Sequence, residues 1–361
     1  AAGISCEASL KMTAFGMALI PDFARDGATD EADRHRVATN EVFRFWINDD
    51  KDTGDIAEDD SDVPGQENAN SSDAVVNGRC DLLDFFPVWV DLKRALDFLP
   101  QQGVTYKLSN ADGALKLVYT GLAKDQARSY LKAECAVCGP SFDHNACDAT
   151  TVEVTAEGVE LPPAFLNLIR DDWRKGILMM EGVTATQSPL VLEVWKEEIL
   201  LCKTDLPLSF SGVEDMYRWV NLRGAAGGGE SRATATNRPA NFPDSDSNGK
   251  QFVFIHGYSV HEESARAWNA EMFKRLWQAG SRAMFTAVTW FGNEGQLADW
   301  VPFVGGSTPD YYANVINAFE SASNLCSVVS ALPGQKVVAG HSLGNMLVSS
   351  AIVDYGMNVD A

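Results

Sequence analysis

The chain has 361 residues, 45% of them hydrophobic and 22% charged, which is the composition of a folded globular protein of two or three domains. Its 50 acidic and 29 basic residues give a formal net charge of −21, and this charge argues against nucleic acid as a partner. No apolar run reaches the length of a transmembrane helix, so we expect no transmembrane segment. The start lacks an initiator methionine and the layout of a signal peptide, so we expect a piece of a longer chain.

The first 222 residues are expected to form a β-rich, acidic module that is sandwich-like and of α+β type. Two alternating runs, 104–109 and 114–119, flank a turn that contains Asp112 and Gly113, and this pattern predicts a hairpin. The other strands that β-branched and aromatic residues predict are 42–47, 151–155 and 190–195, and the predicted helices are 124–134 and 165–174.

An acidic segment follows the first of these strands, with eight acids and one lysine between residues 48 and 62. Oxygen-bearing side chains in this spacing are typical of a calcium loop, because a hard cation takes several oxygen ligands from one short turn. The glycine expected at the sixth position is Thr53, and Gly54 comes one place late. A structural Ca²⁺ site and a solvated acidic loop are both open interpretations. The candidate ligands are Asn48, Asp50, Asp52, Asp55 and Asp59.

Four potential metal ligands also lie close together in the sequence at Cys135, Cys138, His144 and Cys147. Three thiolates and an imidazole could hold Zn²⁺. A disulfide in a secreted loop explains the same cysteines, and unpaired thiols are the third alternative. The seven cysteines of the chain therefore leave the redox compartment open.

The composition changes at residues 223–250, which are small, polar and rich in glycine and proline, so we expect a flexible linker there. Residues 251–361 then alternate short apolar runs with long helical patterns, and this alternation predicts a parallel sheet. The predicted strands are 251–255, 283–290 and 336–339, and the predicted helices are 262–279 and 312–329.

The last of these strands leads into Gly340-His-Ser342-Leu343-Gly344, a serine between two glycines with a helical pattern after it. This is the layout of a nucleophile elbow, in which a sharp strand-to-helix turn exposes the serine hydroxyl. Gly340 and Gly344 lack side chains, so neighbouring segments can approach closely. The backbone N–H of Leu343 would point to the place where an oxyanion forms.

A second motif, His256-Gly257-Tyr258, follows the strand 251–255 directly. With both motifs in this order, residues 251–361 resemble the α/β-hydrolase superfamily in its lipase- and esterase-like group. The resemblance implies that the Tyr258 and Leu343 N–H groups hold the oxyanion, with His256, Gly257, Gly340 and Gly344 as scaffold of the motifs. It also implies acyl transfer from a small ester or lipid to water without a cofactor, with amides as a further substrate class.

The 19 residues after Ser342 (361 − 342 = 19) contain Asp354 and Asp360 but no histidine. In the family the acid and the histidine follow the nucleophile. We therefore expect the N-terminal half of a hydrolase domain, inactive alone, with the acid and the histidine in the remainder of a longer chain. The alternative is a secreted or cell-surface binding protein, stabilised by Ca²⁺, whose hydrolase domain is degenerate. An extracellular or cell-surface location fits both, and a cytoplasmic one stays open.

Several aromatic and apolar residues lie between the predicted strand 283–290 and the helix that follows it. They could wall an acyl pocket near the serine, or they could simply pack as a loop and the start of a helix. These residues are Trp290, Phe291, Trp300, Pro302, Phe303, Tyr311 and Tyr312.

Overall fold

The computed structural model describes seven stretches of the chain, and all structural statements below concern these residues. They form fifteen strands in four sheets, six α-helices and two short 3-10 helices, so the protein is of mixed α/β class with both antiparallel and parallel sheets. The predicted helix 124–134, the cysteine cluster 135–147 and the ligands Asp50, Asp52, Asp55 and Asp59 lie outside the described residues. The described residues are 16–49, 63–65, 83–119, 151–171, 175–226, 246–298 and 300–361.

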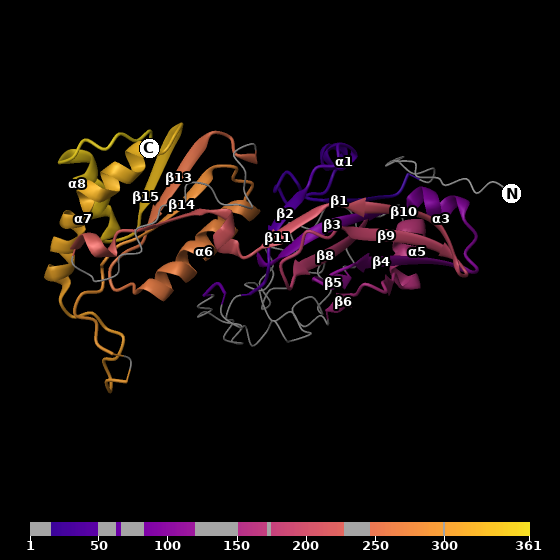
Figure 1. Ribbon diagram of the computed structural model, residues 1–361, viewed down its shortest axis with the longest axis horizontal. Coiled ribbons are helices and arrows are strands. Elements are labelled where there is room, and N and C mark those ends of the chain that lie inside the picture. Colours follow the sequence, from indigo (N-terminus) through magenta and orange to yellow (C-terminus); the bar gives the residue numbers. More distant parts are fainter. Residues whose placement is uncertain are drawn as a thin grey trace.

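Two antiparallel sheets make up most of the N-terminal part (Figure 1). The five-stranded sheet has the order β1 (Ala18–Pro21), β3 (Phe85–Asp91), β8 (Gly176–Gly182), β5 (Leu115–Tyr119) and β6 (Val152–Val154). The four-stranded sheet has the order β10 (Ile199–Leu206), β9 (Leu190–Lys196), β4 (Val104–Asn110) and β7 (Val159–Glu160). A parallel pair, β2 (Phe43–Trp46) with β11 (Leu208–Ser211), and the helices α1 (Glu31–Ala38), α3 (Lys93–Phe98) and α5 (Pro163–Asp171) complete this part.

Side chains from both antiparallel sheets meet in one hydrophobic core. In β9 the buried residues Leu190, Leu192 and Val194 alternate with more exposed ones, as expected for a strand with one face on the core. Leu115 and Leu117 of β5 bring the other sheet to the same core. The prediction of a β-rich N-terminal region is therefore confirmed for the described residues.

The predicted hairpin between 104–109 and 114–119 is wrong in its pairing. Both runs are strands, but β4 pairs with β7 and β9, whereas β5 pairs with β6 and β8. The buried Asn110 fixes the corner, because its Oδ1 accepts from the Ala114 N–H and its Nδ2 donates to the carbonyls of Ser188 and Pro189. The turn at Gly113 thus carries the chain from one sheet to the other.

The C-terminal part is built on a four-stranded parallel sheet with the order β12 (Arg218–Asn221), β14 (Met284–Thr289), β13 (Lys250–Ile255) and β15 (Gln335–Gly340). Its helices are α6 (Glu262–Gln278), α7 (Tyr311–Ala331) and α8 (Gly344–Val353). The parallel sheet predicted from the alternating pattern is confirmed.

This sheet begins earlier than the predicted boundary at 251. Strand β12 lies before residue 223, between the 3-10 helices η2 (Val213–Met216) and η3 (Arg223–Ala226), the second of which occupies the start of the predicted linker. Strand β12 has only four residues, too few for a periodic pattern to separate it from the neighbouring turns.

Alternate residues of the parallel sheet face two different layers. Val253 and Ile255 face a core that they share with α7 and α8, whereas Phe254 and Phe285 belong to the core on the α6 side. That second core is continuous with the core of the antiparallel sheets, so α6 lies between the parallel sheet and the N-terminal part (Figure 1). No helix among the described residues has both the length and the apolarity that a membrane span requires.

Candidate active site

Ser342 stands in the turn between β15 and α8, with a positive φ of 49°. A left-handed conformation is uncommon for a residue with a side chain, and it is the strained geometry of a nucleophile elbow. Backbone hydrogen bonds fix the turn on both sides of the serine, from the Gly344 N–H to the His341 carbonyl (2.8 Å) and from the Asn345 N–H to the Ser342 carbonyl (3.0 Å). The side chain of Ser342 is exposed.

The two glycines of the motif are required by close contacts. A Cβ on Gly344 would lie 2.5 Å from the His256 carbonyl oxygen, and one on Gly340 would lie 2.9 Å from the Asn345 nitrogen. Real Cβ atoms do not approach backbone atoms so closely, so a side chain at either position would force β15 and α8 apart or displace β13. The sequence-based assignment of both glycines as scaffold agrees with this geometry.

Strand register brings the two motifs together, although about 85 residues separate them. Strands β13 and β15 are parallel neighbours, and Ile255 is paired with Gly340, so the residues after each strand leave the sheet side by side. The His341 N–H donates to the Ile255 carbonyl at 2.8 Å. A Cβ on Gly257 would lie 3.0 Å from the Cβ of Ser342, so Gly257 lets the 256–258 segment lie directly against the serine.

Of the two predicted oxyanion donors, Leu343 follows Ser342 directly in the turn, and Tyr258 follows Gly257 in the segment that packs against the serine. Among the described residues, no backbone hydrogen bond is donated by the N–H of Tyr258 or of Leu343. A buried or half-buried N–H without a partner is rare in a folded protein, and two of them beside an exposed serine can donate to a developing negative charge.

The ring of His256 sets the direction of one of these donors. His256 is fully buried, and its Nε2 accepts from the Trp290 N–H (3.2 Å) and contacts Thr289 Oγ1 (2.9 Å). Because Nε2 is an acceptor, the proton of the neutral ring is on Nδ1, which donates to the Gly257 carbonyl at 2.9 Å. In a trans peptide the C=O and the N–H point in opposite directions, so this bond turns the Tyr258 N–H away from the ring.

The same environment keeps His256 neutral. Burial is the main cause that lowers its pKa to about 3, against the opposing effect of the hydrogen bond to the Gly257 carbonyl, while the charges of Arg223 and His341 lower the pKa further. An imidazole with such a pKa does not act as a general base at neutral pH, because its conjugate acid is too strong. The geometry agrees with the role of motif scaffold that the sequence suggested.

Arg223 is a site residue that sequence reasoning missed. Its buried guanidinium donates to Thr289 Oγ1 (3.0 Å), Asn293 Oδ1 (2.8 Å) and the Val260 carbonyl (2.8 Å). It thus joins the end of β14 to the chain that follows Tyr258, and it places a positive charge near the candidate oxyanion hole. No signal in the sequence marks it, because it opens a run of small residues that is typical of a linker.

The other histidines near the turn do not contact the serine. The His341 ring is exposed and packs against Trp268, with ring centroids 5.3 Å apart. His261 caps α6, where its Nδ1 accepts from the Ser264 N–H at 3.2 Å. Within the part of the chain that the structure describes, no imidazole is hydrogen-bonded to Ser342.

Three of the aromatic residues that could wall an acyl pocket lie in different environments. Trp290 is fully buried, and its Nε1 donates to the His256 carbonyl at 2.8 Å. Tyr311 packs edge-on against Tyr258, with ring centroids 5.1 Å apart. Phe303 is completely exposed. Trp290, Tyr311 and Phe303 therefore do not form one wall, and the packing of Trp290 and Tyr311 fits the alternative of a packed loop and helix start.

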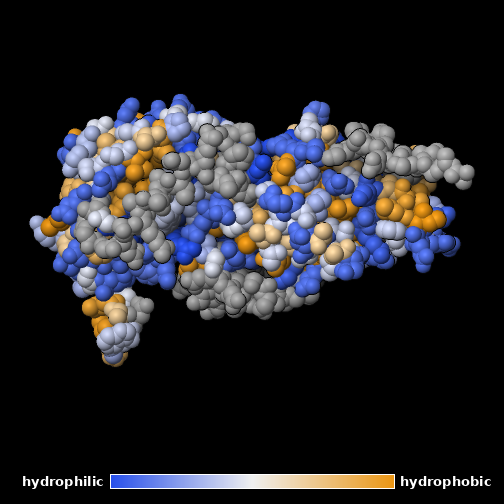
Figure 2. Space-filling view, in the orientation of Figure 1, coloured by the Kyte–Doolittle hydropathy of each residue, from blue (hydrophilic) through white to orange (hydrophobic). Residues whose placement is uncertain are grey.

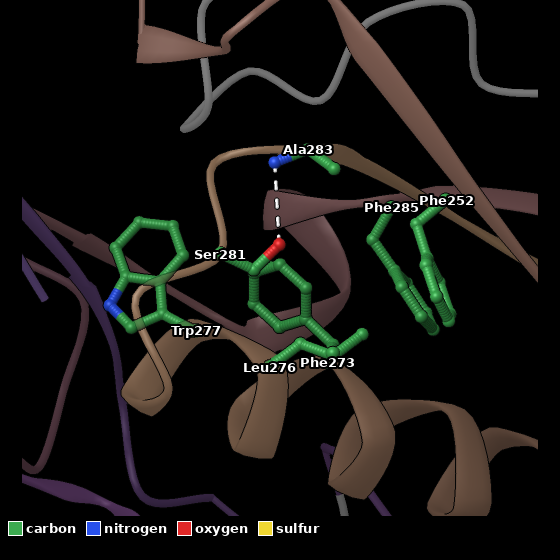
Figure 3. A pocket seen from close by; sticks show the side chains of 7 residues that line it. All are labelled: Phe252, Phe273, Leu276, Trp277, Ser281, Ala283 and Phe285. Carbon is green, nitrogen blue, oxygen red and sulfur yellow. Dashed lines mark hydrogen bonds between the residues drawn. The ribbon is translucent and has the colours of Figure 1, made fainter. Parts of the chain in front are cut away.

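A small pocket lies elsewhere, between α6 and the sheet (Figure 3). Its volume of about 10 Å³ is at the lower limit for a single water molecule. Phe252 and Phe285, which line it, are paired near the amino-terminal ends of β13 and β14, whereas Ser342 follows the carboxyl-terminal end of β15. The pocket is thus at the opposite end of the sheet from the serine.

The candidate calcium site is described only at its first residues. Asn48 is buried, and its Nδ2 donates to Glu181 Oε2 at 3.2 Å. The described stretches hold no cluster of three or more side chains suited to bind a metal ion. The other four ligands lie outside these stretches, so calcium binding stays a prediction.

No protein-family model matches the chain, and no curated protein is significantly similar to it.

Proposed function

We propose that the protein is a serine hydrolase of the α/β-hydrolase type, with Ser342 as its nucleophile and esters or lipids as its substrates. One observation carries the proposal: an exposed serine with a φ of 49° stands in a strand-to-helix turn, and the Gly257 segment lies directly against it. A strained conformation needs a compensating reason, and nucleophile elbows are a known case.

The reaction that fits this arrangement is acyl transfer to water. The Ser342 Oγ would lose its proton to a base as it bonds to the ester carbonyl carbon, and the Tyr258 and Leu343 N–H groups would donate to the resulting oxyanion. Collapse of this intermediate releases the alcohol, which takes up the proton, and leaves an acyl-serine. Water then adds to the acyl carbon and gives a proton to the same base. Collapse of this second intermediate breaks the bond to Ser342 Oγ, which takes the proton back, and releases the carboxylic acid. No cofactor takes part in these steps.

The proposal needs a general base, because an unassisted serine hydroxyl is a weak nucleophile. Of the nearby histidines, His256 is locked in a scaffold and the rings of His261 and His341 are engaged elsewhere. We therefore expect the catalytic histidine and its acid to come from outside the described residues, and we expect the 361-residue chain alone to be inactive or nearly so.

Ester hydrolysis by the complete gene product tests the proposal. We expect turnover of p-nitrophenyl esters, and we expect Ser342→Ala to lower it at least about 1,000-fold, as removal of a catalytic nucleophile does. Ser349→Ala is the matched control, because Ser349 is an exposed serine on α8 and should leave the rate unchanged. Equal rates for Ser342→Ala and the unmodified protein would contradict the proposal and favour a binding protein with a degenerate hydrolase domain.

A further inference from the structure

The loop between β14 and α7 carries a group of exposed hydrophobic residues. It protrudes from the C-terminal part as a narrow extension (Figure 1), on which hydrophobic residues lie beside residues of intermediate hydropathy (Figure 2). Trp300 is 83% exposed, Phe303 106% and Val304 46%. We refer to these three residues as the aromatic tip. Large apolar side chains so exposed, and grouped on one protrusion, mark an interaction site more often than chance exposure.

Specific hydrogen bonds hold the aromatic tip in place. The Leu297 N–H donates to the Ser307 carbonyl (2.8 Å) and the Gly306 N–H returns a bond to the Leu297 carbonyl (2.9 Å), which closes the base of the loop. Phe303 has a φ of 67°, an unfavourable conformation for a bulky residue that gains no packing in return. A strained backbone that holds a phenylalanine in an exposed position indicates that this side chain contacts another molecule.

The charge around the tip restricts the partner. Residues 291–312 contain three acids and neither lysine, arginine nor histidine. A surface of anionic lipids would repel such a loop, since polybasic rather than acidic segments bind those membranes. An uncharged or zwitterionic surface carries no such penalty, and tryptophan is favoured at the level of lipid headgroups, where its ring is apolar and its N–H stays wet.

The size of the tip favours a lipid surface over a protein partner. An aromatic side chain buries about 150–250 Å², so Trp300 and Phe303 together offer roughly 300–500 Å². A specific protein interface needs about 800 Å² from each partner. A narrow protrusion cannot supply that area, but two inserted aromatic side chains suffice for reversible attachment to a lipid surface.

We infer that the aromatic tip inserts into the headgroup region of an uncharged or zwitterionic lipid surface. The loop base is joined to the segment beside Ser342, because Thr308 Oγ1 lies 2.9 Å from Ser259 Oγ and Tyr311 packs on Tyr258. Insertion therefore brings the candidate active site close to that surface. This second step rests on the proposed function and narrows its substrates to esters in lipid aggregates, whereas the binding itself does not depend on catalysis.

Co-sedimentation of the 361-residue chain with phosphatidylcholine vesicles tests the inference. We expect binding, and we expect Trp300→Ser with Phe303→Ser to weaken it at least about tenfold, since each removes an apolar side chain that the lipid surface would bury. Phe98→Ser is the matched control, because Phe98 is 76% exposed on α3 in the other part of the molecule. Partial replacement of phosphatidylcholine by phosphatidylserine should weaken the binding of the unmodified chain.

Three results would overturn the inference: no binding to phosphatidylcholine vesicles, equal binding by the double variant, or an equal loss with Phe98→Ser. The variant Ser342→Ala separates the lipid-binding inference from the proposed function, because it should bind vesicles as the unmodified chain does. Both substituted tip residues are exposed, so unchanged thermal unfolding of the double variant would show that lost binding is not lost folding.

Discussion

At the scale of single residues, the site depends on side chains whose surroundings give them unusual properties. Ser342 keeps a left-handed backbone in an exposed turn, and His256 is an uncharged imidazole enclosed by protein. The sequence indicated both, because a local motif marks each of them. It did not indicate Arg223, whose importance comes from three partners far away in the sequence. Local patterns predict residues whose role is local, and they miss those that act through the folded arrangement.

The buried His256 predicts how stability depends on pH. Its pKa is about 3 in the fold and about 6.5 when exposed, so below pH 6.5 the unfolded chain takes up a proton that the folded chain does not. This group therefore stabilises the fold above pH 6.5, and its contribution is lost towards pH 3 by about 1.4 kcal/mol per pH unit. Asp22 acts in the opposite direction, because burial raises its pKa to about 7.

The difference between the unmodified chain and His256→Asn isolates this contribution. Asparagine keeps an amide donor for the Gly257 carbonyl but does not titrate. In urea unfolding between pH 4 and 7, we expect the stability advantage of the unmodified chain over this variant to shrink as the pH falls. A constant difference for His256→Asn would show that the fold does not lower the pKa of this ring.

At the scale of elements, the strand–turn–helix unit of β15 and α8 was predictable because its apolar strand, its small turn residues and its helix are contiguous. The placement of β4 and β5 in separate sheets was not predictable, since it depends on hydrogen bonds from Asn110 to carbonyls almost eighty residues away. Strand β12 escaped prediction because four residues are too short for a periodic signal. Neither the sequence motifs nor the described part of the structure shows the base that the candidate serine requires.

Gly344→Ala tests the contact between these elements. The added Cβ would meet the His256 carbonyl, a backbone atom that cannot move without shifting the end of β13. We expect a loss of about 1–3 kcal/mol in unfolding free energy, the usual cost of overpacking, measured by chemical denaturation. Gly113→Ala is the control, since nothing lies within 4 Å of its added Cβ and only its positive φ is penalised. An equal or smaller loss for Gly344→Ala would argue against the close approach.

At the scale of the whole molecule, the two parts share one core rather than meeting at a loose interface. Phe273 and Trp277 of α6 contact Trp46 of β2 in that core. Beside them Lys274 lies 2.7 Å from Asp84, and both side chains are almost completely buried. Burial lowers the pKa of Lys274, and attraction by Asp49 opposes this effect. The sequence suggested a linker between separate domains, because composition cannot reveal which apolar faces pack together.

Lys274→Met tests this shared core. Removal of one partner leaves Asp84 buried without its ammonium group, so we expect the unfolding free energy to fall by about 3–5 kcal/mol. Asp84→Asn in the same chain should restore part of the loss, because it removes the remaining charge. Arg275→Met, which breaks a pair with Glu271 on the same helix whose side chains are 46% and 18% exposed, should cost less than Lys274→Met. A Lys274→Met variant as stable as Arg275→Met would show that the interface does not depend on this pair.

The most direct test of the central claim is fluorophosphonate labelling of the complete gene product and of the 361-residue chain, with the modified residue located by mass spectrometry. The reagent reacts with a serine only where a base activates it. We predict labelling of the complete protein at Ser342, loss of this label in Ser342→Ala, and little or no labelling of the 361-residue chain. An unlabelled complete protein, or a label on another serine, would contradict the assignment of Ser342 as a catalytic nucleophile.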